Sequence, residues 1–589
     1  MRAALSFVIV GLIAAGVALE SQQASPAFSA KDLSAPPRTS WLKNGGSLFN
    51  QNYSPLTHIN RDTVATLKGV WRTHVNGSGV GMKYSGEAQP VVHEGTIYIP
   101  TGADDVFALS VKTGRILWNY KAGLPDAIPT VCCGWTSRGV AIGDGRVYVG
   151  QLDGRLVALD QRTGNVAWSI QGERWQNGYT ITAAPLYYDG KVIVGFAGGE
   201  NGTRGRVKAF DAKDGHLIWT FYTVPGPGEF GHETWPQGND AWLHGGGTVW
   251  QTPAVDPELG LIIFTTGNPG PDFNGRIRAG DNLFTTSMVA IDAATGKYRW
   301  HFQQIHHDLW DYDGPSPVVL FDVMINGRLR KAAAEPNKAG WVYIVDRTNG
   351  TPLIGIDEKP VPQEPRQATS KTQPIPRGDA FIPQSVDIAP EDYPLVNQGR
   401  IFTPFWKEAI VAKPGARGGA NWPPSSYDPA TNILYVCATD AANLFRGGED
   451  DQQITPEGQR YLGSAFGGAP LPAAGIFAAL DMKTNKLVWQ QRWRDSCYSG
   501  SVTTAGGLVF TGRNDGRLTA LNSSTGKRLW EFQTGAGMNS PVSVFEYEGD
   551  EYVVAYSAGS LFAGTVKGDS VWLFSTKGTL SEGDSPSTR

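Results

Sequence analysis

Short segments in which apolar and polar positions alternate recur along most of this chain, in pairs separated by a turn. In six pairs an alanine is followed, usually, by Asp or Asn, then by Thr-Gly or a close variant, and ten residues after the alanine by a tryptophan. These copies are Ala108–Trp118, Ala158–Trp168, Ala209–Trp219, Ala290–Trp300, Ala479–Trp489 and Ala520–Trp530. Alternation over a few residues, bounded by turn residues, is typical of β-strands, so each copy predicts a β-hairpin.

The spacing of the copies predicts a repeat architecture. The first copies lie about 50 residues apart and the last two about 41, which is the length of one four-stranded propeller blade. Degenerate copies at 343–350 and 427–436, the segment around Trp71 and closing strands at 552–574 bring the count to about eight. We therefore predict an all-β fold, an eight-bladed β-propeller in which each tryptophan packs against the alanine and turn glycine of the adjacent blade.

Two stretches interrupt the repeat. Residues 357–394 are rich in proline and polar residues, and residues 441–474 are rich in glycine with a small acidic cluster. Long insertions in a propeller project from one end, where they commonly form the wall of a binding site, although a surface loop without such a role is an alternative. We predict one propeller domain over residues 31–589 that carries these two insertions.

Residues 1–30 are typical of an export signal followed by a flexible N-terminus. Arg2 precedes an apolar run that ends at Ala18, and small residues there allow cleavage after residue 18. The run is short for a membrane span, so an uncleaved anchor is the less favoured alternative. Export leads to an oxidising compartment, in which disulfides form and persist.

Charge and composition exclude some classes of partner. The 589 residues carry a formal net charge of −4, and acidic and basic residues are interspersed without a basic tract. We therefore expect no nucleic-acid partner. Nineteen tryptophans together with 73 glycines and 38 prolines fit many short strands joined by tight turns.

Two adjacent cysteines, Cys132 and Cys133, stand in the segment CCGWTSRG. A disulfide between neighbours would close a ring that contains nothing and would add almost no chain-entropy stabilisation. Such a strained element indicates a local role, and the alternatives are two reduced thiols or a pairing elsewhere. Cys437 and Cys497 could form a second bridge or remain free.

The Ala–Asp–Thr-Gly–Trp repeat resembles the tryptophan-docking motif of quinoprotein alcohol dehydrogenases, over roughly residues 41–577. The resemblance implies pyrroloquinoline quinone (PQQ) bound at the centre of an eight-bladed propeller. Cys132, Cys133 and Arg138 match the family's CC-x4-R segment, whose vicinal disulfide lies flat against one face of the quinone. Trp250, in GGGTVW, matches the tryptophan that stacks on the opposite face.

Other positions match cofactor-contacting residues of that family. Arg138 is expected to hold the quinone oxygens and to orient the catalytic base, and Lys338 to reach the reactive edge of the quinone. The remaining expected contacts are Glu87, Thr182, Ala197, Gly198, Thr248 and Asn421.

The resemblance also implies a metal site. PQQ carries carboxylates, so a hard cation that bridges it to the protein needs oxygen ligands. The matching residues are Glu200 in GFAGGENGTRG, Asn268 in TTGNPGP and Asp311 in HHDLWDYDG. Asp311 is also the expected general base, taking the proton of the substrate hydroxyl while hydride passes to the quinone. A carboxylate beside a cation stays ionised at neutral pH, as a base must.

Asp313 is an additional carboxylate at a position where calcium-dependent methanol dehydrogenases have a small neutral residue and lanthanide-dependent relatives have Asp. Residues two apart on a strand lie on the same side, so we predict Asp313 as a further ligand and favour a lanthanide ion. The stretch HHDLWDYD also resembles membrane-bound sugar and polyol quinoproteins, which use divalent ions, so Ca²⁺ is the alternative. We expect His306 and His307 to shape this loop by hydrogen bonding.

Three positions depart from the methanol dehydrogenase pattern. Gly150 stands in place of a cofactor-binding Thr, Tyr498 in place of a Trp near the quinone, and Leu561 and Phe562 in place of a Trp-containing stretch over the pocket. These changes predict a differently shaped or roomier cavity. The expected substrate is an alcohol in the broad sense, namely a primary alcohol, a polyol or a sugar, or an aldehyde hydrate.

The sequence contains no Cys-x-x-Cys-His segment, so we expect no covalently attached haem. By resemblance, a periplasmic dehydrogenase of this kind passes electrons to a separate cytochrome c, and a homodimer is left open. The first alternative is a non-catalytic propeller that serves as a periplasmic binding or assembly platform. That alternative gives no reason for Cys132, Cys133, Glu200, Asn268 and Asp311 to occur together. A hydrolytic propeller would need a nucleophile–base pair, which the sequence does not offer.

Overall fold

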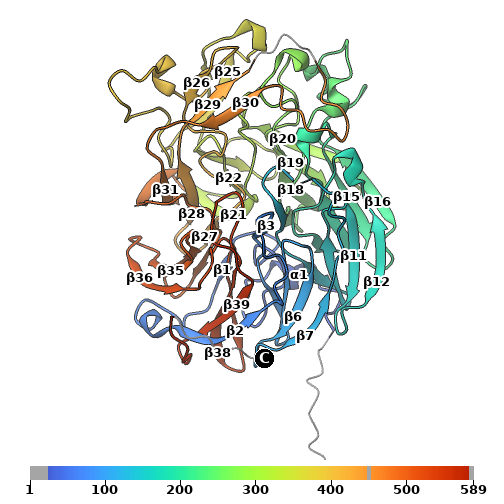
Figure 1. Cartoon of the computed structure of the whole chain (residues 1–589), viewed down its shortest axis with the longest axis vertical. Helices are drawn as coiled ribbons and strands as arrows, with labels where there is room; N and C mark the ends of the chain where they lie inside the picture. Colours follow the sequence, from blue (N-terminus) through green and yellow to red (C-terminus); the bar gives the residue numbers. More distant parts are fainter. Residues whose placement is uncertain (1–23, 130, 448–452, 583–589) are drawn as a thin grey trace, which may run out of the picture.

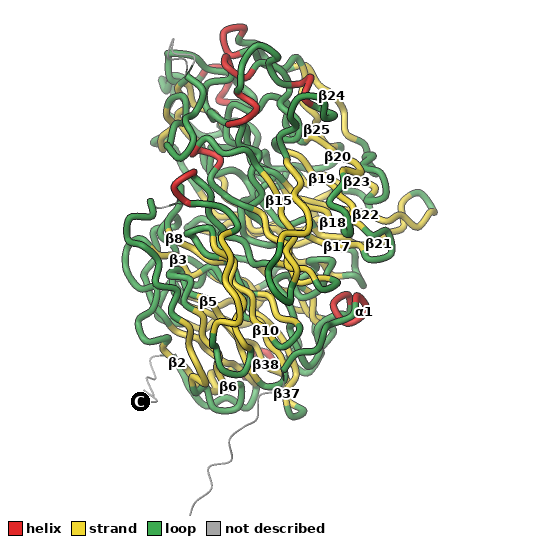
Figure 2. The backbone as a smooth tube through the Cα atoms, turned by 90° about the vertical axis from the view of Figure 1, so that its right-hand side faces the viewer, coloured by secondary structure: helices red, strands yellow, loops and turns green. Residues whose placement is uncertain are grey.

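Consecutive antiparallel sheets, arranged in a ring in chain order, make up most of the protein (Figure 1). The computed structural model describes residues 24–129, 131–447 and 453–582. Strands dominate these residues, and the helical turns among them are few and short (Figure 2). The predicted all-β propeller fold is thus confirmed.

Eight of these sheets follow one another around the ring, and we call them the main sheets. The first four contain β4 (Val91–His93), β5 (Thr96–Pro100), β6 (Val106–Ser110) and β7 (Ile116–Tyr120); β9 (Ala141–Gly143), β10 (Arg146–Gly150), β11 (Arg155–Asp160) and β12 (Val166–Gln171); β13 (Leu186–Tyr188), β14 (Lys191–Gly195), β15 (Arg206–Asp211) and β16 (Leu217–Tyr222); and β17 (Ala254–Asp256), β18 (Leu261–Thr265), β19 (Ser287–Asp292) and β20 (Tyr298–Gln303).

The other main sheets vary more in their number of strands. They contain β21 (Val319–Ile325), β22 (Arg328–Pro336) and β23 (Val342–Asp346); β27 (Ser426–Asp428), β28 (Ile433–Asp440), β31 (Ala474–Asp481) and β32 (Lys486–Trp493); β33 (Ser501–Thr504), β34 (Leu508–Gly512), β35 (Arg517–Asn522) and β36 (Arg528–Gln533), with β1 (Tyr53–Ser54) at the edge; and β37 (Ser543–Tyr547), β38 (Asp550–Ser557) and β39 (Ser570–Ser575), with β2 (Lys68–His74). The count of eight blades stays a prediction, because the sheet β21–β23 would have to serve as a blade of three strands.

The last main sheet combines a strand from the N-terminal part of the chain with the three final strands. Strand β2 pairs antiparallel with β39, and Arg72 lies opposite Trp572 in this register. In Figure 1 the two strands lie side by side at the bottom of the ring. Hydrogen bonds between an early and a late strand therefore complete the last sheet.

The repeat tryptophans contact the turn of the following sheet. The indole Nε1 of Trp118 donates to the carbonyl of Gln161 at 3.0 Å. Gly164 in that turn has φ +72°, and a Cβ there would lie 2.5 Å from Cε3 of Trp118, so the indole packs directly on the glycine backbone. The alanine in strand register with each tryptophan belongs to its own sheet, as with Ala158 and Trp168.

Residues 48–52, just before β1, contact strands of several main sheets through their backbone carbonyl oxygens. The carbonyl of Leu48 accepts a hydrogen bond from Val255 N (2.8 Å), that of Phe49 from Leu320 N (2.9 Å), that of Gln51 from Tyr427 N (2.8 Å) and that of Asn52 from Thr503 N (3.0 Å). These donors belong to β17, β21, β27 and β33, so one short segment links four main sheets.

Part of the N-terminal stretch predicted as flexible packs on the propeller. The carbonyl of Ser25 accepts a hydrogen bond from Gly145 N at 2.7 Å, and Phe28 is buried against the ring of His93. Helix α1 (Ala30–Ser34) follows. The predicted signal sequence and its cleavage after residue 18 lie outside the described residues. Within them, no helix is both long and apolar enough to cross a membrane.

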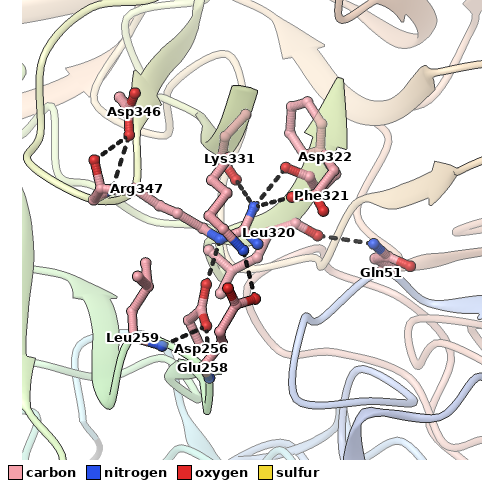
Figure 3. Close-up of polar contacts among 12 residues, drawn as sticks. Gln51, Asp256, Glu258, Leu259, Leu320, Phe321, Asp322, Lys331, Asp346 and Arg347 are labelled. Carbon is pink, nitrogen blue, oxygen red and sulfur yellow. Dashed lines mark hydrogen bonds and ion pairs between the residues drawn. The ribbon is translucent and has the colours of Figure 1, made fainter. Parts of the chain in front are cut away.

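Buried Arg347, directly after β23, joins two neighbouring main sheets (Figure 3). Its Nε lies 2.6 Å from Asp256 Oδ2 at the end of β17. Its Nη1 donates to the carbonyl of Phe321 and to Asp322 Oδ1 in β21, both at 2.7 Å. Arg347 and Asp256 are only 4% and 1% exposed, so this ion pair is shielded from water.

The two insertions have secondary structure of their own, and it gathers at the top of Figure 1. The first contains the hairpin β24 (Ile356–Pro360) and β25 (Thr372–Pro376), and the second contributes two strands of a three-stranded sheet. That sheet contains β26 (Ile410–Ala412), β29 (Asn443–Arg446) and β30 (Ala465–Gly468). A parallel pair, β3 (Tyr84–Gly86) and β8 (Trp135–Ser137), lies apart from the main sheets.

Short 3₁₀ turns occur along the described chain. They are η1 (Val64–Thr66), η2 (Trp175–Asn177), η3 (Gly199–Asn201), η4 (His232–Thr234), η5 (Ala241–His244), η6 (Arg276–Arg278), η7 (Pro365–Gln367) and η8 (Val396–Gly399).

A disulfide joins Cys437 in β28 to Cys497, 60 residues later and just before β33. It is buried in a small apolar cluster that includes Phe477 and Val509. The sequence left this pairing open, and the fold brings the two Cα atoms to 5.4 Å.

Candidate active site

Segments from most of the main sheets meet around one cavity of about 1000 Å³, including its open mouth. The sequence-predicted residues that line it are Cys132, Cys133, Arg138, Thr182, Ala197, Gly198, Glu200, Thr248, Trp250, Asn268, Asp311, Asp313, Lys338 and Asn421. Glu87 is the remaining predicted site residue, and it does not line the cavity.

One wall of the cavity is a disulfide between sequence neighbours. Cys132 and Cys133 are bonded to each other, with Cα atoms 3.9 Å apart. Gly134 follows with φ +95°, where a Cβ would come within 2.8 Å of a methyl of Leu561. The glycine therefore lets the chain turn tightly away from the disulfide while both sulfur-bearing residues face the cavity.

Arg138 is held by contacts on several sides. Its Nη2 lies 3.1 Å from Glu87 Oε2, and its Nη1 donates to Thr182 Oγ1 at 3.1 Å and to the Trp250 carbonyl at 3.3 Å. The guanidinium carbon lies 5.5 Å from the centre of the Trp250 ring and 5.2 Å from that of Trp422. Burial raises the pKa of Glu87, and Arg138 opposes that rise. Glu87 thus contributes to the cavity by orienting Arg138.

Lys338 bridges two carboxylates in the cavity wall. Its Nζ lies 2.8 Å from Asp311 Oδ1 and 2.6 Å from Asp313 Oδ2. Burial raises the pKa of Asp311 well above its ordinary value, Lys338 lowers it, and the charge of Asp313 raises it further. The ammonium group is therefore the nearest compensation for two acidic side chains.

More oxygen atoms face the same part of the cavity. Asp313 Oδ1 accepts a hydrogen bond from Asn268 N at 2.6 Å. Asp272, which the sequence analysis missed, also lines the cavity, and its Oδ1 is buried without a hydrogen-bond partner among the described residues. Burial and neighbouring carboxylates raise the pKa of both Glu200 and Asp272. A set of carboxylate and amide oxygens with excess negative charge fits a hard cation such as Ca²⁺ or a lanthanide.

Among the described residues, no three carboxylates of the cavity have oxygen atoms that all lie within 4.8 Å of one another. The described residues do contain one group of three possible metal-ligating side chains whose ligand atoms all lie within 4.8 Å of one another. It lies at a surface turn and consists of Asp211, Asp214 and His216.

The segment that carries Asp311 and Asp313 is not a strand, so the reason given for placing both on one side was wrong. Asp311 has φ +60°, a left-handed conformation that Asp tolerates better than most residues. Both carboxylates nevertheless line the cavity, while Trp310 and Tyr312 are buried and do not line it. The turn at Asp311, rather than strand alternation, produces this arrangement.

Two histidines fix the start of that segment through hydrogen bonds, as expected. The ring nitrogens of His307 lie 2.7 Å from the carbonyl oxygens of Gly280 and Gln367. His306 Nδ1 lies 2.7 Å from Gln303 Oε1. Gln367 belongs to the first insertion, which therefore supports the segment from behind without lining the cavity.

The second insertion reaches the cavity directly. Its residues Arg460, Leu462 and Phe466 line the wall, as expected for a long insertion at one end of a propeller. Among the described residues, neither a hydrogen bond nor an ion pair joins Arg460 to another side chain.

The positions that depart from the methanol dehydrogenase pattern behave differently from one another. Tyr498 and Phe562 line the cavity, with ring centres 5.4 Å apart, whereas Leu561 does not. Gly150 does not line the cavity either. It packs against Ile181, and a Cβ at position 150 would clash with Ile181 Cγ2. The expectation that Gly150 enlarges the cavity was therefore wrong, since Ile181 fills that space.

Sequence reasoning missed five lining residues that carry charge or a large aromatic ring: Asp272, Arg417, Trp422, Arg460 and Phe466. Asp272 ends the stretch NPGPD, so an acidic residue four positions after Asn268 was an available signal. Trp422 directly follows Asn421, which was predicted. The two arginines had no such signal, because they lie in segments without a repeat.

Comparisons with known proteins agree with one another. A family model for PQQ-type glucose/ethanol/alcohol dehydrogenase β-propeller domains matches residues 41–553. Quinoprotein alcohol dehydrogenase PedH of Pseudomonas putida is 34% identical over 585 residues, which cover 94% of this chain and 91% of that protein. Quinoprotein ethanol dehydrogenase of Pseudomonas aeruginosa is 32% identical, with 90% of each chain covered.

Solved structures give the same result. Quinohemoprotein alcohol dehydrogenase from Comamonas testosteroni matches with a TM-score of 0.79 and 30% identity, over 94% of this chain and 83% of that one. A europium-containing methanol dehydrogenase matches with a TM-score of 0.77 and 26% identity, over 93% of this chain and 99% of that one.

Proposed function

Since this chain belongs to the family of PQQ-dependent glucose, ethanol and alcohol dehydrogenases, we propose that it oxidises an alcohol to an aldehyde or ketone and passes the electrons to a separate periplasmic cytochrome c. The main support for this proposal is that fourteen of the predicted site residues line the same cavity. These residues come from segments spread between positions 132 and 421, so the fold alone brings them together.

We assign the quinone to the space between the Cys132–Cys133 disulfide and Trp250. A disulfide has no hydrogen-bond donors and a flat apolar surface, and an indole stacks well on a flat ring system. Arg138, with one guanidinium edge committed to Glu87 and buried Nε left without a partner, would hold the carboxylate or carbonyl oxygens of the quinone. Thr182 and Thr248 supply hydroxyl groups at the same wall.

We assign the metal ion to the oxygens of Glu200, Asn268, Asp311 and Asp313. All four are hard donors, and three of them are carboxylates. We favour a lanthanide, because a trivalent ion gains more than Ca²⁺ from the extra carboxylate of Asp313. The similarity to a europium-containing methanol dehydrogenase is compatible with that choice.

Asp311 acts as the general base in this proposal. It would accept the proton of the substrate hydroxyl, and Lys338, 2.8 Å away, would hold the carboxylate in its ionised form. When bound, the quinone supplies the two-electron acceptor and the cation polarises its carbonyl group. The apolar side chains of Leu462, Phe466 and Phe562 at the cavity would exclude water from this reaction.

The substrate class follows from the same walls. Tyr498 and Phe562 form an aromatic side of the cavity, which suits a primary alcohol with an apolar chain. Export to the periplasm is supported by the apolar N-terminal run in the sequence and by the two disulfides.

Reconstitution tests this function. The purified protein is mixed with PQQ and either Ca²⁺ or La³⁺, and its near-ultraviolet absorption and dye-linked oxidation of an alcohol panel are recorded. Quinone absorption and alcohol oxidation by the wild type, together with loss of at least 1000-fold in kcat but retained quinone binding in Asp311→Asn, would support it. A protein that binds no quinone with either ion would be the non-catalytic platform instead.

A further inference from the structure

Arg278, at the end of η6, is fully buried and contacts two separate segments of the cavity wall. Its Nε donates to the carbonyl of Pro271 at 3.0 Å, and its Nη2 donates to the carbonyl of Asp272 at 3.1 Å. The same Nη2 donates to the carbonyl of Asp308 at 2.6 Å. One guanidinium group thus joins the segment that carries Asn268 and Asp272 to the segment that carries Asp311.

Hydrogen bonds within the second segment connect Asp308, which Arg278 contacts, to the residues on either side of Asp311. The side chain of Asp308 accepts hydrogen bonds from Trp310 N at 2.9 Å and from Tyr312 N at 2.7 Å. These two amides flank Asp311, whose backbone has φ +60°. Asp308 therefore braces the left-handed turn from both sides, and Arg278 holds Asp308 through its carbonyl.

The fourth contact of Arg278 explains why an arginine is needed. Its Nη1 donates to Asn282 Oδ1 at 2.9 Å, and Asn282 Nδ2 returns a hydrogen bond to the Arg278 carbonyl at 2.7 Å. The guanidinium has five donors in a fixed plane, whereas the ammonium of lysine has three on a flexible chain. Lysine at this position could keep the charge but could not make all four side-chain contacts.

We propose that Arg278 is a positioning residue that holds the Asn268–Asp272 and Asp308–Asp313 segments in the relative arrangement that lets Asp272, Asp311 and Asp313 face one cavity. The expected effect of Arg278 on catalysis rests on the proposed function. Its effect on the arrangement of the two segments does not, because that effect concerns only contacts within the chain. Misplacement of a reacting group by about 1 Å can cost about 100-fold in rate, so a joint of this kind matters for catalysis.

Amide hydrogen exchange on the full-length protein tests the positional role directly. Arg278→Lys should raise the exchange rates of the Trp310 and Tyr312 amides at least tenfold, since loss of the carbonyl contact loosens the turn. Arg276→Lys is the matched control, because Arg276 lies in the same 3₁₀ turn with its side chain exposed. Asn282→Ala is a second variant, which removes both hydrogen bonds between Asn282 and Arg278 but leaves the guanidinium and its carbonyl contacts in place, and it should raise the same rates by a smaller factor. Unchanged exchange in Arg278→Lys and Asn282→Ala would overturn the proposal.

Kinetics of the protein loaded with PQQ and La³⁺ or Ca²⁺ test the catalytic meaning. Arg278→Lys should lower kcat at least tenfold and weaken La³⁺ binding at least tenfold, with KM for the alcohol changed less than threefold. Faster exchange together with unchanged kcat and La³⁺ affinity would overturn the positioning role in catalysis. A wild-type protein that binds no PQQ would instead refute the proposed function, and the exchange data would still decide the positional role.

Discussion

Lys338 Nζ lies 2.8 Å from Asp311 Oδ1, and the buried ammonium and the partly exposed carboxylate form an ion pair in the wall of the cavity. Loss of hydration raises the pKa of the Asp311 carboxyl group well above its ordinary value, because less water is left to stabilise its charge. The ammonium opposes that effect. The contact therefore lowers the pKa of Asp311 and favours its ionised form.

Replacement of Lys338 by Met should move the acidic limb of the kcat/KM profile toward higher pH by at least 1 pH unit. Loss of the positive neighbour favours the neutral carboxyl group, so the pKa of Asp311 rises and the ionised base appears only at higher pH. The measurement is dye-linked alcohol oxidation between pH 5 and pH 10 for wild type and Lys338→Met. An unshifted acidic limb with reduced kcat would mean that Lys338 has no influence on the ionisation of the base.

Removal of the Asp313 carboxylate should separate the two candidate metals. We expect Asp313→Ala to lose at least 100-fold of the activity with La³⁺ and less than tenfold of the activity with Ca²⁺, because a trivalent ion depends more on each negative ligand. Asp313→Asn, which keeps the size of the side chain, serves as the control for packing. Equal losses with both ions would show that Asp313 supports the site without selecting the metal.

The two disulfides should contribute to different properties. The Cys437–Cys497 bridge spans 60 residues, so the chain-entropy model assigns it about 4 kcal/mol of stability. The Cys132–Cys133 bridge closes no loop, so its removal should change the free energy of unfolding by less than about 1 kcal/mol.

Paired Ala substitutions at each bridge, compared by denaturant unfolding and by quinone titration, measure this difference. We expect the pair at Cys132 and Cys133 to weaken quinone binding at least tenfold and the pair at Cys437 and Cys497 to leave it within threefold. The reverse pattern would assign the structural role to the neighbouring pair.

The Arg347 ion pair in Figure 3 should be important for stability. Arg347→Met leaves the buried carboxylate of Asp256 without its partner, which should destabilise the fold by about 3–5 kcal/mol. Lys331 forms an ion pair with exposed Glu258 at 2.6 Å in the same region, and Lys331→Met should cost less than about 1 kcal/mol. Denaturant unfolding of the three proteins at one pH gives both values, and similar losses in the two variants would contradict the argument from burial.

Glu335 should make the stability of the protein depend on pH. Its carboxyl group is fully buried and accepts hydrogen bonds from Gln304 Nε2 at 2.6 Å and from Ser316 N at 3.1 Å. Burial raises its pKa to about 8, above that of a Glu in the unfolded chain. Between about pH 4.5 and 8 the folded state therefore binds more protons than the unfolded state, and stability falls as pH rises through this window.

The neutral variant Glu335→Gln should reduce this pH dependence. We expect the fall in free energy of unfolding between pH 5 and pH 8, on the order of a few kcal/mol for the wild type, to become smaller in the variant. Urea unfolding at several pH values measures it. Parallel curves for the two proteins would indicate that other groups cause the dependence.

The repeat was predictable because it depends on side chains at fixed spacing. A tryptophan ten residues after an alanine is visible in the sequence, and Trp118 and its equivalents contact the next turn at a glycine such as Gly164. Leu48 and Phe49 gave no comparable signal. They link main sheets through backbone carbonyl oxygens, which every residue has.

Much of the site was also predictable, but by resemblance rather than by physical pattern. Asp311 and Lys338 are 27 residues apart in the sequence, and no periodicity indicates that their side chains form an ion pair. Arg278 was missed because its partners are carbonyl oxygens of irregular segments. Arg460 was missed because it belongs to an insertion whose path over the cavity is set by long-range packing.

The pairing of β2 with β39 has a consequence for synthesis of the protein. Strand β2 ends at His74 and β39 begins at Ser570, so at about 5–20 residues per second the ribosome needs roughly 25–100 s between them. During that time β2 is an unpaired strand on a growing chain, open to the wrong partners. Because β39 is the last strand of the ring to be synthesised, the sheet that contains β2 can be completed only near the end of translation.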